Sequence, residues 1–396
     1  MRLLRMILLV APLLTLVIQG ILPRPSNGLP LFARKYGVAC TTCHMAFPRL
    51  NSFGMAFRQN GYRMPAAKGT SPWEDKEFPL SLVASVGVDY FSTDAFDSAA
   101  GKRQTTSASE FVQNTVEFHT AGTLAPEITF HFDNNFEGVD GPLNSGMAFV
   151  MFDDVAKDGA LNVKLGIYDQ EIPYLSDSRR TTWSHYLSPV TLGAEGFELN
   201  GTKSAWTYAL GLGNSSRTQG KSTDRSLNRL ENTYAWLMRD FKGQLVTARV
   251  VLDRQDPRDT TTSSSLHTQA ELSAYLNHGR WVLIPGFTYE KFDKADETLF
   301  DPENLTNGAR DKIETALLEG LVFLDKDSKW LLTARYEQRQ LPKFMSLVKE
   351  TDQSIVGGVN WYANPNARLG LEWSHVSDDI DGPKTNEVQA YVHLGY

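Results

Sequence analysis

Alternating apolar and polar residues constrain the fold of this 396-residue chain more than any other feature of its sequence. In residues 330–337, Trp330 and Leu332 fall on one face of an extended chain. Arg335 and Glu337 fall on the opposite face. A repeat of two residues indicates a β-strand with one apolar face. Because several such segments carry charge on the second face, that face suits a water-filled lumen better than the packed core of a soluble β-sandwich.

Strand candidates follow one another from Pro79 to the C-terminus. They cover residues 80–90, 109–120, 126–135, 146–155, 160–168, 190–200, 204–213, 231–239, 244–253, 268–277, 279–290, 314–325, 328–338, 354–363, 367–375 and 387–396. Short turns such as Asp158-Gly159 alternate with long polar connections such as 214–230 and 291–313. The sequence therefore predicts an all-β fold, an antiparallel outer-membrane β-barrel of about 16 strands over residues 79–396.

Aromatic residues recur near the ends of the predicted strands. They are Trp206, Tyr208, Tyr234, Trp236, Trp281, Tyr289, Trp330, Tyr336, Trp361, Tyr362, Trp373 and Tyr396. Outer-membrane barrels carry aromatic girdles of this kind at both membrane interfaces. The net charge of −7 argues against non-specific binding to nucleic acid. Outer-membrane lipid is therefore an expected partner, and nucleic acid is not.

The first 28 residues are typical of a secretory signal peptide. Arg2 and Arg5 precede an apolar run over residues 6–18. Pro12 interrupts this run, which is shorter than the about 20 apolar residues that a transmembrane helix requires. We expect residues 1–28 to be removed on export, so that Leu29 begins the mature chain.

Both cysteines of the chain lie in one pentapeptide, Cys40-Thr41-Thr42-Cys43-His44. This C-x-x-C-H spacing is the attachment signature of a c-type haem. Each thiol can form one thioether to the porphyrin, and the histidine supplies the proximal ligand of the iron. A thioredoxin-like redox pair requires a βαβ setting that the flanking residues lack, and a closed zinc site requires a fourth ligand. The motif predicts one covalent haem c, held by Cys40 and Cys43, with His44 on the iron.

A short helix is expected directly after this motif. Leu50, Phe53 and Phe57 recur at helical spacing, and Gly61 is placed to end the helix. We expect these three apolar side chains to pack on the haem. The whole cytochrome segment, residues 29–78, is too short to bury a haem alone. The polar lumen of the barrel is the expected remainder of its surroundings, with the segment as a plug in or over the periplasmic mouth.

The sequence around the motif resembles a known family. Phe32-Ala33-Arg34-Lys35-Tyr36, the C-T-T-C-H motif, residues 46–54 and Asn60-Gly61-Tyr62-Arg63 are similar to the fused monohaem cytochrome–porins of bacterial outer membranes. The resemblance implies electron transfer between an extracellular donor, Fe(II) in the best-known members, and a periplasmic carrier such as a soluble cytochrome c. It also implies possible activity as an Fe(II) oxidase with that carrier as acceptor.

The distal ligand of the iron is left open by the sequence. Met64 is the first candidate because Met64-Pro65 resembles the distal-ligand loop of small cytochromes c. Met55, His131 and His393 are the alternatives. The function has an alternative as well, a solute porin whose haem segment acts as a redox gate or sensor.

Overall fold

The architecture is described from a computed structural model of the protein. The described residues are 31–64, 79–97, 100–135, 144–169, 175–176, 179–188, 193–214, 230–255, 265–292, 312–341, 350–364, 366–378 and 382–395. The predicted signal peptide, residues 1–28, lies outside them, as do residues 65–78 and Tyr396.

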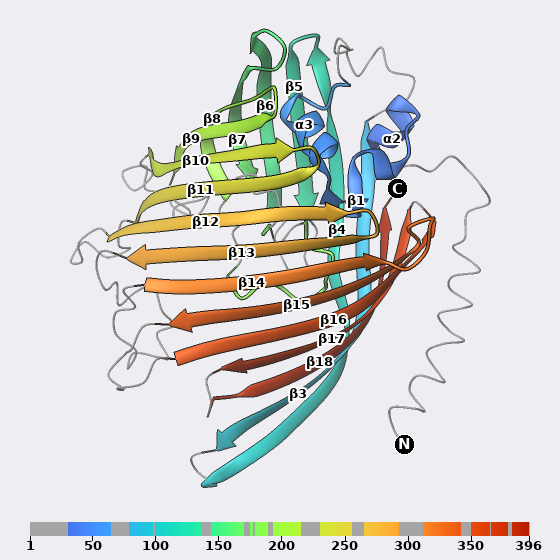
Figure 1. The fold of residues 1–396 in the computed structure, drawn as a ribbon, viewed down its shortest axis with the longest axis vertical. Coiled ribbons are helices and arrows are strands. Elements are labelled where there is room, and N and C mark those ends of the chain that lie inside the picture. Colours follow the sequence, from blue (N-terminus) through green and yellow to red (C-terminus); the bar gives the residue numbers. More distant parts are fainter. Residues whose placement is uncertain are drawn as a thin grey trace.

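Sixteen antiparallel strands close into one barrel, which confirms the predicted fold class (Figure 1). The strands are β3 (Leu80–Asp97), β4 (Lys102–Ala125), β5 (Ile128–Asn135), β6 (Asn144–Ala156), β7 (Leu161–Asp169), β8 (Gly193–Lys203), β9 (Trp206–Asn214), β10 (Leu230–Phe241), β11 (Gln244–Gln255), β12 (Ser265–His278), β13 (Trp281–Phe292), β14 (Lys312–Phe323), β15 (Trp330–Leu341), β16 (Glu350–Asn364), β17 (Ala367–Asp378) and β18 (Lys384–Gly395). The last strand pairs with the first, with Val392 opposite Val86. Each predicted strand corresponds to one observed strand.

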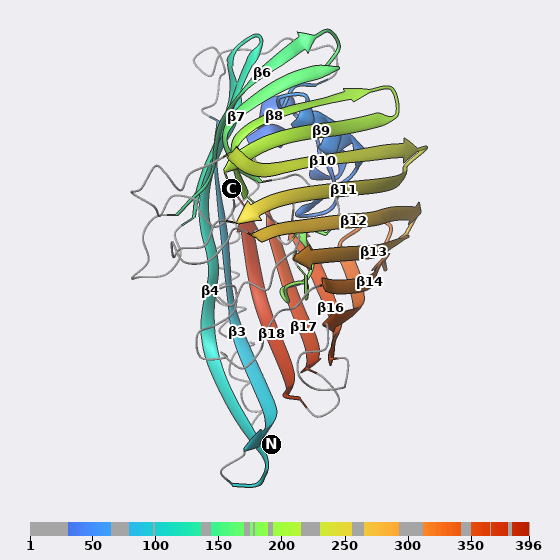
Figure 2. The same cartoon turned by 90° about the vertical axis from the view of Figure 1, so that its left-hand side faces the viewer.

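The first hairpin of the barrel extends well beyond its predicted bounds. The β3–β4 pairing continues to Asp97 opposite Lys102, and Figure 2 shows the two strands as the longest of the wall. Arg103 Nε lies 3.1 Å from Asp94 Oδ2 on this extension. The residues of the extension are mostly polar, so they lack the apolar alternation from which the strands were predicted.

The two faces of the wall differ as the alternation predicted. On β15, Trp330 is 43% exposed on the outer face, whereas Arg335 is only 2% exposed on the inner face. Exposed aromatic side chains also follow the girdle prediction. They include Trp206, Trp281, Trp330, Tyr336 and Trp373. The prediction was wrong for Tyr234 and Trp236, because both lie buried on the inner face of β10.

The described N-terminal residues form a compact group of short elements beside the barrel ends that carry the short turns (Figure 1). These elements are α2 (Leu31–Tyr36), the 3-10 helix η1 (Cys40–Thr42), β1 (His44–Ala46), β2 (Arg49–Leu50) and α3 (Ser52–Gln59). The predicted helix is α3, and Gly61 follows it with a φ of 66°. Leu50 lies before this helix, on β2, because Asn51 caps the helix by accepting a hydrogen bond from the Gly54 amide. No helix among the described residues is long and apolar enough to span a membrane.

Candidate functional site

The C-x-x-C-H turn is held in place by Asn51. The side-chain amide of Asn51 donates hydrogen bonds to the carbonyl oxygens of Thr41 and Thr42, at 3.3 and 3.1 Å. Its backbone amide donates to the carbonyl oxygen of Cys43 at 2.9 Å. One residue therefore caps α3 and fixes the turn that carries both cysteines.

The imidazole of His44 has one nitrogen occupied by the backbone. Its Nδ1 lies 3.1 Å from the carbonyl oxygen of Pro48. Burial lowers the pKa of His44 to about 4, although the hydrogen bond to Pro48 acts in the opposite direction. The ring is therefore neutral at neutral pH, and protonated Nδ1 donates to Pro48. This tautomer leaves the Nε2 lone pair for a metal, and a hydrogen bond of this kind commonly orients a ligating histidine.

Neither cysteine forms a disulfide, both are partly buried, and burial raises the pKa of each thiol. Helix α3 packs closely on the turn, since a Cβ at Gly54 would lie 2.1 Å from the Cys43 carbonyl oxygen. Two thiols outside any disulfide and a neutral, oriented imidazole on one turn are the donor set of a covalent c-type haem. The residues present therefore fit that group.

The predicted haem-packing residues lie in or beside an aromatic cluster of the same segment. Phe57 is buried, and its ring centroid lies 5.2 Å from that of Phe32 and 6.3 Å from that of Phe53. Phe32 also stacks on Tyr62, with centroids 4.7 Å apart. Leu50 packs against this core and is only partly buried. The cluster joins α2 to α3, while the packing of Leu50, Phe53 and Phe57 on a haem stays a prediction.

The candidates for the distal ligand have different surroundings. Met64 is partly buried beside the aromatic core, while Met55 is fully buried. Met55 Sδ accepts a hydrogen bond from Arg179 Nη1 at 3.7 Å. His131 and His393 lie on the inner wall, where His131 contacts Tyr62 and His393 contacts Ser85. Ligation of the iron by Met64, or by any of these alternatives, stays a prediction.

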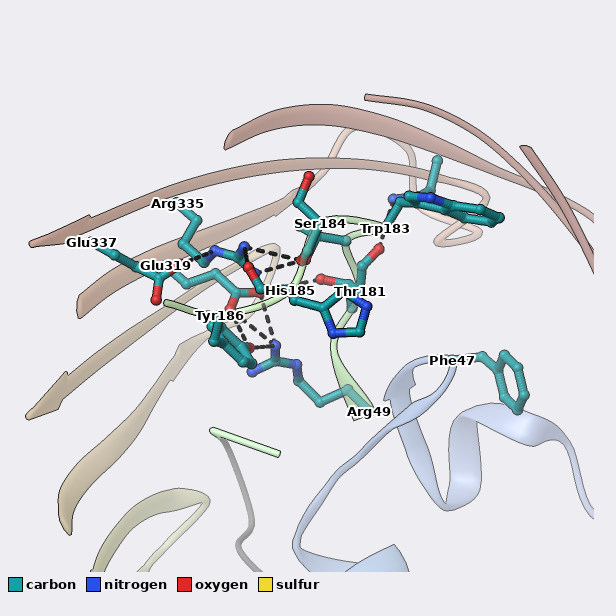
Figure 3. Close-up of polar contacts among 12 residues, drawn as sticks. Phe47, Arg49, Thr181, Trp183, Ser184, His185, Tyr186, Glu319, Arg335 and Glu337 are labelled. Atoms are coloured by element: carbon teal, nitrogen blue, oxygen red, sulfur yellow. Dashed lines mark hydrogen bonds and ion pairs between the residues drawn. The ribbon is translucent and has the colours of Figure 1, made fainter. Parts of the chain in front are cut away.

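One side of the segment is fixed to the wall by a buried ion pair (Figure 3). Arg49 Nη2 lies 2.9 Å from Glu319 Oε1 on β14, and both side chains are fully buried. The same nitrogen donates to the Tyr186 hydroxyl at 2.8 Å, and that hydroxyl donates to Glu319 Oε2 at 2.8 Å. Removal of one member of such a pair leaves a buried charge uncompensated. This network therefore couples the segment to the wall.

Tyr186 belongs to a connection that folds inward from the end of β7. The carboxylate of Glu372 on β17 accepts hydrogen bonds from the amides of Trp183 and Ser184, both at 2.7 Å. On β15, Arg335 donates to the carbonyl oxygen of Ser184 at 3.0 Å (Figure 3). Residues 179–188, here called the inner loop, therefore lie against the wall of the lumen beside the N-terminal segment.

The other side of the segment contacts β5 to β7. The Tyr62 hydroxyl lies 2.8 Å from His131 Nδ1, and Arg63 Nη1 lies 2.8 Å from Asp154 Oδ2. The side-chain amide of Asn162 donates to the carbonyl oxygen of Gln59 at 2.8 Å. The segment is thus anchored to opposite parts of the wall.

Sequence reasoning missed most of these anchors. Arg49 is an isolated basic residue that follows the motif, and Glu319 is one of many acidic residues on the predicted inner face. The inner loop falls in the long connection between predicted strands 160–168 and 190–200. Its length was a signal of a functional loop. Which side chains it meets depends on barrel closure, since Glu319 lies 138 positions from Thr181 and 133 positions from Tyr186.

Comparisons with known proteins show the class of barrel. No family model and no curated protein match the sequence. Three similar solved structures each cover 80% of this chain. An anion-selective porin from Comamonas acidovorans has a TM-score of 0.55 at 11% identity, over 99% of its own chain. The outer-membrane channel DcaP of Acinetobacter baumannii has a TM-score of 0.57 at 12% identity. OmpF of Salmonella typhi, in complex with daunomycin, has a TM-score of 0.54 at 12% identity, and each match covers 97% of that protein's chain.

At these identities the similarity shows the fold, a porin-like barrel of sixteen strands. A closed barrel satisfies its own backbone hydrogen bonds, and this one turns an apolar face outward. These are the requirements for spanning the outer membrane. The chain is a bacterial outer-membrane barrel protein.

Proposed function

We propose that this barrel protein transfers electrons across the outer membrane through one covalent haem c. Cys40 and Cys43 would form the thioethers, and His44 would be the proximal ligand. The donor would be extracellular, with Fe(II) as the expected species, and the acceptor a periplasmic carrier such as a soluble cytochrome c.

The observation that carries the proposal is the hydrogen bond between His44 Nδ1 and the Pro48 carbonyl oxygen, at 3.1 Å. It orients the imidazole so that Nε2 is the nitrogen for a metal, next to two thiols that form no disulfide. A thiol pair used for disulfide exchange has no requirement for an oriented histidine at the next position.

A bound haem would supply a one-electron couple at the iron. The chain's own residues hold the site within the barrel. The Arg49–Glu319 pair and the Tyr62–His131 contact anchor the segment on two sides. The inner loop lies beside it on β14 to β17. These contacts place polar groups of the segment and the inner loop against the inner wall, which supports a conduit for electrons over an open path for solutes.

Haem attachment is tested by peroxidase staining of denaturing gels. The wild type should retain a stained band, because thioether bonds survive denaturation. Cys40→Ala/Cys43→Ala should lose the stain, and Thr41→Ser/Thr42→Ser, in the same turn, should keep it. A stained band in the cysteine variant would overturn the assignment.

Electron transfer is tested in liposomes that carry the protein with its long loops outward. External Fe(II), held outside by a membrane-impermeant chelator of moderate affinity, should give the visible spectrum of reduced haem. Conductance in a planar bilayer should stay well below that of an open barrel with sixteen strands. An unchanged spectrum with external Fe(II) would refute the electron-transfer proposal.

The second candidate function is a solute porin with a redox gate. The structural similarity to a porin and an outer-membrane channel favours this function, because the matched region covers nearly the whole chain of each of those proteins. This function requires a conductance that is large in one redox state and small in the other. A small conductance in both states would exclude it.

A further inference from the structure

Two histidines and an aspartate meet on the inner wall beside the N-terminal segment. His119 on β4 is paired directly opposite Asp133 on β5, and His131 lies two residues before Asp133 on the same face. His131 and Asp133 are buried, and the side chain of His119 is 26% exposed. One ligand atom from each residue can be chosen so that all three lie within 4.8 Å of one another.

The three ligand atoms are almost at metal-binding separation. Asp133 Oδ2 lies 3.1 Å from His131 Nε2 and 3.8 Å from His119 Nδ1. Bonds of about 2.0–2.2 Å to one ion place neighbouring ligand atoms about 3.0–3.5 Å apart. Small side-chain rotations would therefore bring the three atoms around one ion.

The other polar atom of each candidate ligand already has a partner. The Tyr62 hydroxyl lies 2.8 Å from His131 Nδ1, and Glu117 Oε2 lies 2.9 Å from His119 Nε2. The Met147 amide donates to Asp133 Oδ1. Such outer contacts orient metal ligands and fix the histidine tautomer. They leave His131 Nε2, His119 Nδ1 and Asp133 Oδ2 directed at one another.

We propose that His119, His131 and Asp133 bind one divalent first-row transition-metal ion within the lumen. Two imidazoles and one carboxylate favour such an ion over Mg²⁺ or Ca²⁺, which prefer oxygen ligands. Three protein ligands leave coordination positions for water or a further ligand. On binding, the His131 proton moves from Nε2 to Nδ1, where the Tyr62 oxygen can accept it. The site does not depend on the haem.

Because Tyr62 belongs to the N-terminal segment, this site spans the junction between segment and wall. The proton shift on His131 changes the Tyr62 hydroxyl from donor to acceptor and keeps the contact. Metal occupancy should therefore stabilise docking of the segment as well as the wall. Thermal unfolding of the segment then reports on the same site as metal binding.

The test is equilibrium dialysis of the full chain, without an affinity tag, against Zn²⁺ or Co²⁺ after chelator treatment. One equivalent should bind to the wild type at micromolar free metal and raise its Tm. Asp133→Asn and His119→Asn should each weaken binding at least tenfold and abolish the Tm shift. His278→Asn and His375→Asn, which change histidines of other strands, should bind as the wild type does.

A Cys40→Ala/Cys43→Ala background separates this site from the thiols of the motif. That variant should still bind one equivalent, whether or not the wild type carries haem. Tyr62→Phe should weaken binding about 10-fold to 100-fold, as expected for loss of an outer partner. Retention of one tight equivalent by His119→Asn/Asp133→Asn, or no binding to the folded wild type, would overturn the proposal. Heat-modified mobility on gels verifies that each variant is folded.

Discussion

On strand β14, the apolar outer face is exposed and the charged inner face is buried. Leu318 is 46% exposed on the outer face, while its neighbour Glu319 is fully buried on the inner face. In a soluble protein the leucine would be buried and the glutamate exposed. Lipid replaces water around Leu318, and the N-terminal segment and the inner loop replace water around Glu319 through Arg49 and Tyr186. Around Glu319, the inner side of the wall is therefore a packed polar interior and not a water-exposed surface.

Loss of Arg49 should have the largest effect on the inner side. Arg49→Ala leaves the fully buried Glu319 carboxylate without its ion-pair partner, which costs about 3–5 kcal/mol. We expect the segment to loosen and the single-channel conductance to rise. Planar-bilayer recordings and thermal unfolding measure the two effects.

Arg249→Ala is the matched control for this prediction. It removes the buried partner of Glu271, at 3.5 Å, from a pair that joins β11 to β12 within the wall. It should lower stability without the same rise in conductance. Equal conductance changes in both variants would show that the segment is not held by Arg49.

A charge on the outer face should have the next largest effect. Leu318→Arg places a guanidinium in the lipid near the middle of β14, at a cost of about 2–4 kcal/mol. The midpoint of urea unfolding in lipid vesicles should fall accordingly, while the conductance stays unchanged. Leu318→Met keeps the apolar surface and should behave as the wild type. An unaltered midpoint for Leu318→Arg would mean that this face does not contact lipid.

A loss of charge beneath the inner loop should have a smaller effect than a charge on the outer face. Glu372→Gln removes the charge that accepts the amides of Trp183 and Ser184, at an expected cost of about 1–2 kcal/mol. Limited proteolysis from the outer side should then cut the loop faster. Glu314→Gln, which alters an exposed pair with Lys312, is the control and should leave the cleavage rate unchanged. Identical cleavage in both variants would contradict a fixed loop.

The smallest effect is expected at the rim, in the turn between β14 and β15. Desolvation raises the pKa of the Asp325 carboxyl, but the amides of Trp330 and Lys329 and other backbone groups together hold it below its usual value of 3.8. The carboxylate therefore stabilises the fold above about pH 4, and this contribution disappears as the pH falls through the lowered pKa.

Asp325→Asn should accordingly destabilise the barrel slightly at neutral pH and not at all in strong acid. Unfolding midpoints measured from pH 7 to pH 2 test this dependence. Asp327→Asn removes another charge from the same turn and is the control. A difference between wild type and Asp325→Asn that grows toward low pH would contradict the assigned sign.

The barrel could be predicted almost strand by strand, because each strand faces lipid on one side and polar groups on the other. The alternation of Trp330, Leu332 and Tyr336 carries that information locally. The outer extension of the β3–β4 hairpin could not be predicted, since its residues are mostly polar and lack the apolar alternation. Tyr234 and Trp236 were assigned to the wrong face of the wall. Strand-end position alone does not say which face an aromatic ring occupies.

The candidate haem site was also predictable as a motif, because its donor atoms lie within five consecutive residues. The contacts that hold this motif in place were not predictable. Asn51, Gly54 and Pro48 act on the motif through backbone contacts that only the folded segment creates.

The strands, the all-β class and the position of the C-x-x-C-H turn follow from the sequence alone, since each depends on residues close in the chain. The pairing of charges depends on the tertiary fold. Arg49 and Glu319 are 270 positions apart, and Tyr62 and His131 are 69 apart. Such pairs form where barrel closure brings distant strands around the segment. In that buried setting, an unpaired charge or hydroxyl is costly enough to select one arrangement.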